Sequence, residues 1–183
     1  PHFVRRRQRQ MCIRDRLQQN LLTKSSEYVN LANFYLYKKL PIDSSKVIEK
    51  GLKLKILKND IKNNELLSNA YIIAKDFENA IRALVNVTKI SDDSKYDYRI
   101  GQIYLQNSDY SDAIKFFKIA REKGWESKPG SLELLIGICF IELDNFDSAR
   151  IELAKASDLG KEEEVDPWIS YMDSTESLRA AST

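Results

Sequence analysis

The chain has 183 residues, of which 43% are hydrophobic and 31% are charged. This length is sufficient for one domain with a hydrophobic core, and 6 Gly and 4 Pro are too few for a turn-rich all-β fold. No apolar run approaches the ~18–20 residues that a membrane-spanning helix needs. The two cysteines, Cys12 and Cys139, form no CxxC motif and therefore indicate no disulfide framework.

The basic residues at the start of the chain differ in kind from those that follow. Residues 1–16 hold six Arg and one Asp, whereas the other 167 residues hold 18 Lys and five Arg. Without this segment the formal net charge of +2 becomes +2 − 5 = −3. The segment has three interpretations: a nucleic-acid-binding arm, a native disordered lead-in, or foreign sequence, since "RQRQMCIRDR" resembles translated adapter sequence. The switch from Arg to Lys favours the third, so residues 1–16 are left out of the functional interpretation.

A repeated pattern of small and large apolar residues fills the remainder of the chain. Its anchor residues Ser44, Ala80, Ala113 and Ala149 are spaced by 36, 33 and 36 positions. The pattern predicts four pairs of helices, at about 26–57, 61–90, 94–123 and 130–159, within a repeat region that covers 17–160. The small and aromatic positions expected at the helix contacts are Ala32, Tyr35, Ala80, Gly101, Tyr104, Ala113, Ala120, Gly137, Phe140, Ala149 and Ala156.

Gly101 and Gly137 each stand inside a predicted first helix. A helical glycine costs about 1 kcal/mol relative to alanine, so Gly101 and Gly137 indicate close approach of a neighbouring helix. Polar residues between the helices predict their boundaries. Asp43, Asp76, Asp109 and Asn145 are expected to cap the second helices of the pairs, and Gly124 is expected at a helix end.

The last segment, 161–183, predicts a C-terminal capping helix and a tail. Asp166 and Pro167 are typical of a helix start, with Asp as the cap and Pro in the first helical position. After them, an apolar stripe is expected to pack on the last repeat. It comprises Trp168, Ile169 and either Met172 or Tyr171, with Leu178 as an extension; Trp168 and Tyr171 are the cap residues singled out.

The period and the order of these residues resemble the tetratricopeptide repeat (TPR) family, whose repeats have 34 residues. The resemblance implies an all-α solenoid, a right-handed superhelix of antiparallel helix pairs that ends in a capping helix. It also implies a partner-binding groove along the first helices. In register, the groove positions are Asn33, Tyr37, Asn69, Ile73, Tyr98, Gln102 and Glu142. These side chains can equally be solvated or packed helix positions. Val29 stands where carboxylate-clamp TPRs have Lys, which disfavours a clamp.

No residue pattern indicates catalysis. The only histidine, His2, lies in the excluded segment, and Cys139 lies in a predicted buried helix, so His-dependent acid–base and nucleophilic schemes are disfavoured. No glycine-rich phosphate loop is present. The acidic run Glu162–Glu164 is interpreted as solvated surface. The prediction is a non-enzyme with no cofactor and no metal site.

A narrower resemblance covers roughly residues 25–172. The "KG" turn with Pro129-Gly130, the repeat "LIGICFIELDNFDSA" and the closing Trp168-x-x-Tyr171 resemble the C-terminal part of a periplasmic TPR protein associated with TonB systems of gammaproteobacteria. This resemblance implies an adaptor of a TonB–ExbB–ExbD transport complex in the periplasm. The alternative is a general TPR scaffold or co-chaperone in cell-envelope or cytoplasmic assembly. Either role implies a protein or peptide partner and no nucleic acid.

Overall fold

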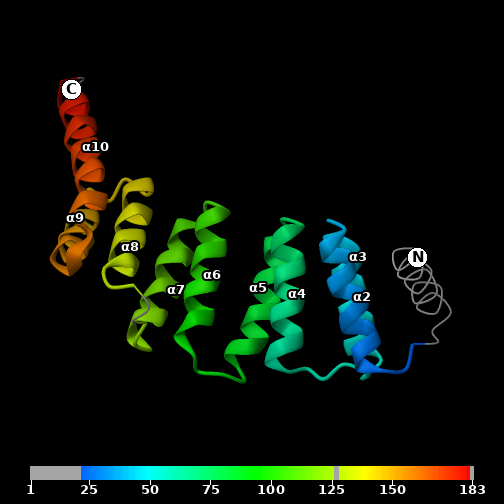
Figure 1. The fold of residues 1–183 in the computed structure, drawn as a ribbon. Helices are drawn as coiled ribbons and strands as arrows, with labels where there is room; N and C mark the ends of the chain where they lie inside the picture. Colours follow the sequence, from blue (N-terminus) through cyan, green and yellow to red (C-terminus); the bar gives the residue numbers. More distant parts are fainter. Residues whose placement is uncertain (1–21, 126–127, 182–183) are drawn as a thin grey trace. The chain divides into compact units, whose positions relative to one another are not determined.

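The computed structural model describes residues 22–125 and 128–181, and all regular secondary structure in these ranges is helical (Figure 1). The basic segment 1–16 lies outside them. The chain divides into two compact units, the first ending at Ser91 and the second beginning at Asp92. Unit 1 contains α2 (Ser25–Tyr37), α3 (Pro41–Lys53), α4 (Ile61–Ile73) and α5 (Phe77–Thr88). Unit 2 contains α6 (Ser94–Gln106), α7 (Tyr110–Glu122), α8 (Ser131–Glu142), α9 (Phe146–Ala156) and α10 (Glu162–Ala181).

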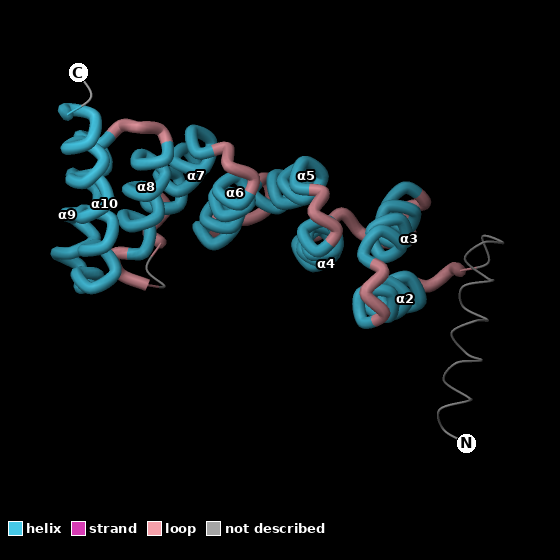
Figure 2. The backbone as a smooth tube through the Cα atoms, turned by 90° about the horizontal axis from the view of Figure 1, so that it is seen from above, coloured by secondary structure: helices cyan, strands magenta, loops and turns pink. Residues whose placement is uncertain are grey.

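Within each unit the helices form antiparallel pairs that pack on their neighbours. In unit 1, α2 packs on α3 and α4 packs on α5, while α3 contacts α4 (Figure 2). In unit 2, α6 packs on α7 and α8 packs on α9, while α7 contacts α8. Consecutive pairs within a unit therefore share a core between the second helix of one pair and the first helix of the next.

The same turn joins the two helices of every pair. An aromatic residue's carbonyl accepts a hydrogen bond of 2.8–2.9 Å from the N–H five residues later, in the pairs Tyr35–Leu40, Tyr71–Asp76, Tyr104–Asp109 and Phe140–Asn145. The residue before each donor is left-handed, with φ between 56° and 62°: Lys39, Lys75, Ser108 and Asp144. This is the hydrogen-bond pattern of a Schellman turn, which satisfies carbonyls at the helix end. The aromatic repeat position therefore marks where each first helix ends.

Gly101 and Gly137 each lie on a first helix where a side chain of the second helix packs against the backbone. A Cβ atom at Gly101 would come within 2.6 Å of the Phe117 ring, and one at Gly137 within 2.8 Å of Leu153. Phe117 and Leu153 are both fully buried on the second helix of the same pair. The close approach expected from the sequence is therefore present at both positions. The anchors Ser44, Ala80, Ala113 and Ala149 are also fully buried, and the Ser44 hydroxyl donates to the Ala32 carbonyl.

The predicted caps have mixed outcomes. Asp76 and Asn145 accept hydrogen bonds from the N–H groups of Asn79 and Ser148, as expected. Asp109 occupies the capping position of α7, but its side chain makes no capping bond. The prediction for Asp43 is wrong, because Pro41 begins α3 and Asp43 lies inside its first turn. Gly124 follows the end of α7 with φ of +77°, which agrees with the expectation for it.

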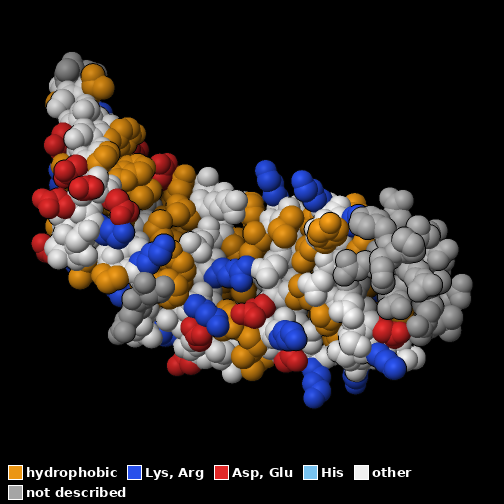
Figure 3. Space-filling view, viewed as in Figure 1, with side chains coloured by type: hydrophobic (Ala, Val, Ile, Leu, Met, Phe, Trp, Pro, Cys, Tyr) orange, Lys and Arg blue, Asp and Glu red, His pale blue; other side chains and the backbone are white. Residues whose placement is uncertain are grey.

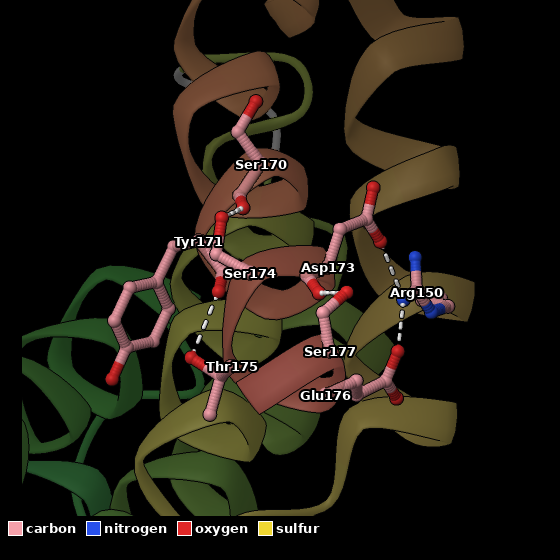
Figure 4. A network of polar contacts seen from close by, with 8 residues as sticks. All are labelled: Arg150, Ser170, Tyr171, Asp173, Ser174, Thr175, Glu176 and Ser177. Carbon is pink, nitrogen blue, oxygen red and sulfur yellow. Dashed lines mark hydrogen bonds and ion pairs between the residues drawn. The ribbon is translucent and has the colours of Figure 1, made fainter. Parts of the chain in front are cut away.

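The C-terminal helix α10 covers the last pair. Val165 and Met172 are buried against a cluster from α8 and α9, with Trp168 and Ile169 partly buried beside them. Arg150 of α9 donates to both Asp173 and Glu176 at 2.7 Å, as Figure 4 shows. Further along α10, Arg179 contacts Asp144 at 2.6 Å. An apolar face and two ion-pair clusters together hold α10 on α8 and α9.

Two details of this segment correct the sequence prediction. The helix begins at Glu162, so Asp166 and Pro167 lie inside it. The break comes earlier, in the turn Ser157–Lys161, where Gly160 has φ of +87°. Tyr171 and Leu178 are 55% and 73% exposed, so Met172 supplies the packing contact and Tyr171 does not. The side chain of Tyr171 points away from Arg150 (Figure 4).

Candidate partner-binding surfaces

The groove positions predicted in unit 1 lie on the first helices of its two pairs. On α2, Asn33 is exposed and Tyr37 is 78% exposed; on α4, Ile73 is 58% exposed and Asn69 is half-buried. Tyr37 and Ile73 are the last residues of their helices and occupy the same repeat position. Unit 1 therefore presents a large apolar side chain at the equivalent place on both first helices.

The groove positions predicted in unit 2 have a different character. Tyr98 stacks on Trp125 with ring centroids 4.1 Å apart and also contacts Phe117. Its hydroxyl accepts a hydrogen bond from Gln102 at 3.1 Å, and burial raises the pKa of Tyr98. Much of the ring of Tyr98 is thus engaged in packing within unit 2, whereas Gln102 and Glu142 are exposed. The exposed groove positions of unit 2 are therefore polar.

Two clefts run along α3 within unit 1. The first, of about 320 Å³, is lined by Ile42, Ser45, Lys46, Glu49, Tyr71, Ala74, Asp76 and Asn79. The second, of about 760 Å³, is lined by Lys46, Glu49, Lys50, Leu52, Lys53, Leu54 and Leu67. The Tyr71 hydroxyl donates to Glu49 at 2.6 Å, and burial, together with this bond, raises the pKa of Tyr71. Glu49 is therefore held by a side chain of the first cleft.

Charge is unevenly distributed between the two units. Residues 22–91 contain 12 basic and 7 acidic residues, a net charge of +5, while residues 92–183 contain 11 basic and 19 acidic residues, a net charge of −8. Acidic side chains gather over α9 and α10 in Figure 3. In unit 2, most basic side chains contact a carboxylate: Lys95, Arg121, Lys123, Arg150, Lys155, Lys161 and Arg179.

Sequence analysis missed the second cleft and its lysines. The composition of the segment Lys38–Lys62, with eight lysines and three acidic residues, was the available signal. The repeat register drew attention to the first helices, whereas the cleft lies along a second helix. No period in the sequence indicates which lysines surround an apolar surface.

The described residues offer little reactive chemistry. Cys139 is fully buried, and burial, with a smaller effect from Glu142, raises the pKa of its thiol to about 12. Within residues 22–125 and 128–181, no group of three or more His, Cys, Asp or Glu is arranged to hold a metal ion. None of the helices in those ranges has both the length and the apolar character that crossing a bilayer requires.

Sequence comparison identifies one repeat of the chain. Residues 98–120, which span most of α6 and most of α7, match the tetratricopeptide repeat family. A comparison with curated proteins finds no match. The matched stretch contains Gly101, Tyr104, Ala113 and Ala120, four of the repeat positions predicted from the sequence.

Structure comparison extends the likeness to most of the chain. A crystal structure of MamA is 17% identical, with a TM-score of 0.62 over 83% of this chain and 88% of that one. MamA 41-end from Desulfovibrio magneticus RS-1 is also 17% identical, with a TM-score of 0.66 over 85% and 88%. YrrB, described as a TPR protein with an unusual peptide-binding site, is 15% identical, with a TM-score of 0.64 over 81% and 75%. The fold is therefore an all-α solenoid of TPR-type helix pairs closed by a C-terminal capping helix.

Proposed function

We propose that this protein is a non-catalytic scaffold that binds a protein or peptide segment through the first helices of unit 1. The observation that carries the proposal is the equivalent placement of Tyr37 and Ile73, two large and exposed apolar side chains at the same repeat position. Asn33 lies one turn before Tyr37, and its amide can pair with a peptide backbone. Apolar anchors beside backbone-pairing amides suit recognition of an extended segment.

Peptide selection followed by affinity measurement tests the proposal. A displayed random peptide library is selected against the full chain, and the enriched peptides are labelled for fluorescence anisotropy. The double variant Tyr37→Ser/Ile73→Ser is expected to weaken binding about tenfold or more, because truncating interface anchors of this kind costs about 1–2 kcal/mol or more. Ile151→Ser is the matched control, since Ile151 in α9 is 59% exposed and Ile73 is 58% exposed. Equal binding by all three proteins would contradict the proposal.

The finer proposal is an adaptor of the TonB–ExbB–ExbD machinery in the periplasm. Its support is the sequence resemblance of residues 25–172, and the alternative is a general scaffold or co-chaperone in envelope or cytoplasmic assembly. Affinity capture from crosslinked gammaproteobacterial envelope extract, read by mass spectrometry, separates the two. Enrichment of TonB, ExbB or ExbD that Tyr37→Ser/Ile73→Ser abolishes would support the adaptor, and recovery of chaperones alone would favour the alternative.

A further inference from the structure

The larger cleft of unit 1 combines an apolar surface with a basic rim. Leu67 of α4 is buried to 8% exposure at this cleft, and Leu52 and Leu54 contribute further apolar surface. Lys46, Lys50 and Lys53 line it from α3. The single acidic residue in the lining is Glu49, whose carboxylate accepts the hydrogen bond from Tyr71. The cleft thus suits an apolar side chain with negative charges on either side of it.

Lys46 and Lys53 of this rim differ from the basic residues of unit 2. Among the described residues, neither Lys46 nor Lys53 lies within 4.0 Å of a carboxylate oxygen, whereas Arg82 of unit 1 forms an exposed ion pair with Glu78. In unit 2, by contrast, Arg121, Lys123 and Arg150 each contact two acidic residues. Charge that is not neutralised within the chain is available to attract an acidic partner.

The spacing of the lysines fits an extended chain. Lys46, Lys50 and Lys53 are four and three residues apart on one helix, which places them on one face at intervals of about 6 and 4.5 Å along the axis. Side chains on one face of an extended peptide recur about every 6.6 Å. Acidic and apolar side chains on one face of such a peptide can therefore lie along this row of lysines.

The segment that follows α3 has a defined conformation. Leu57 is buried, and the Asn63 side chain donates to the Lys58 carbonyl at 3.0 Å. Asn64 donates to Asn59 and to the Asp60 carbonyl at 2.7 and 2.8 Å. The surface next to the cleft is consequently held in place before a partner arrives, which lowers the entropic cost of binding.

We propose that the cleft between α3 and α4 is a second docking site, whose occupant is an extended acidic peptide segment carrying an apolar side chain. The proposal rests on the proposed function, because it assumes that the chain binds peptides, and it assigns a chemical class of partner to a surface outside the first-helix positions. The apolar side chain contacts Leu54 and Leu67, and carboxylates on the same face of the segment, before and after the apolar residue, pair with Lys46 and Lys53. A highly charged polymer such as heparin would use the lysines but leave the leucines uncovered.

The test uses peptides enriched from a random displayed library on the full chain, with affinities measured by fluorescence anisotropy. We expect a class of peptides in which acidic residues lie two positions before and two positions after an apolar residue. Lys46→Glu/Lys53→Glu should weaken their binding about tenfold or more, and Leu54→Ser should weaken it about threefold. The matched control is Lys62→Glu/Lys89→Glu, because both lysines are exposed in unit 1, lie outside the cleft and give the same change in charge. Circular dichroism verifies that each variant is folded.

Each other outcome overturns the proposal. Enriched peptides without acidic residues would exclude an acidic partner. Equal losses of affinity in the cleft variant and the control variant would show that only the net charge of the protein matters. Competition by heparin together with insensitivity to Leu54→Ser would show a general polyanion surface. If peptides depend on Tyr37 and Ile73 and not on the cleft lysines, the second site is wrong while the proposed function stands. If no peptide is enriched, both fail.

Discussion

Units 1 and 2 share the same arrangement of helix pairs but differ in the charge of their surfaces. Both join their helix pairs by the same left-handed turn after an aromatic residue, and both bury a small anchor on the second helix. In unit 2, whose net charge is −8, most basic side chains contact a carboxylate, whereas residues 22–91 of unit 1 carry a net charge of +5, and Lys46 and Lys53 there contact no carboxylate among the described residues. Because helix packing occupies only one face of each helix, the outward charges vary without disturbing the frame. The charged side chains of unit 2 are thus largely engaged within the chain, whereas exposed lysines of unit 1 form part of the docking site that we propose.

The largest change in stability is expected at the repeat position where the two units have different residues. Unit 2 has Gly101 and Gly137 there, while unit 1 has Ala32 and Ser68. Gly101→Leu should lower the free energy of unfolding by about 1–3 kcal/mol, because even a Cβ would lie 2.6 Å from the Phe117 ring. Urea unfolding followed by circular dichroism measures the change. An unchanged midpoint would refute the role of close packing.

A second prediction compares ion pairs in the two units. Glu152 of unit 2 is buried to 6% exposure and contacts Arg121 at 2.9 Å and Lys155 at 3.0 Å. Arg121→Met should destabilise the protein by about 1–2 kcal/mol, since it leaves the buried carboxylate with one partner in place of two. Arg82→Met removes an exposed pair with Glu78 in unit 1 and should cost at most about 0.5 kcal/mol. Equal losses of unfolding free energy in the two variants would contradict the view that the ion pairs of unit 2 contribute more to stability than the ion pair of unit 1.

A third prediction concerns pH and the start of unit 2. Asp93 caps α6, and the hydrogen bond from the Lys95 N–H lowers the pKa of its carboxyl. A lowered pKa in the folded state gives stability that is present above the unfolded value near 4 and is lost as pH falls through the folded value. Asp93→Asn should keep the cap but lose less stability on acidification, so that its melting temperature falls less than that of the parent protein between pH 7 and 2.5. Asp93→Ala should cost about 1 kcal/mol at pH 7 as well.

The smallest effect is expected at Ser68, the counterpart of Gly101 in unit 1. Its hydroxyl is fully buried and has no hydrogen-bond partner among the described residues. Ser68→Ala should therefore raise the free energy of unfolding by about 0.5 kcal/mol, because it removes an unsatisfied polar atom and improves helix propensity. The same urea titration checks the sign. A clear loss of stability would indicate that the hydroxyl has a partner in solution.

The errors in the sequence prediction share one cause. Asp43 and Asp166 were assigned as caps from residue type, yet the boundaries were set by Pro41 in one case and by the left-handed Gly160 in the other. Residue type predicts that a helix boundary lies nearby, whereas the proline and the left-handed glycine decide where the helix begins. Tyr98 remains a predicted groove position, and Trp125, 27 positions away, stacks on its ring.

The sequence by itself determined the repeat: its period, its small and aromatic positions, and therefore the all-α fold. These follow from residue size at fixed spacing, since each helix pair must bury the same stripe against its neighbour. Only the tertiary structure decided which charges are paired and which surround an apolar cleft. Arg121 meets Glu152 and Lys46 lines a cleft with Leu67 because helix packing brings together residues that lie 31 and 21 positions apart. Such contacts carry no period, so no repeat register predicts them.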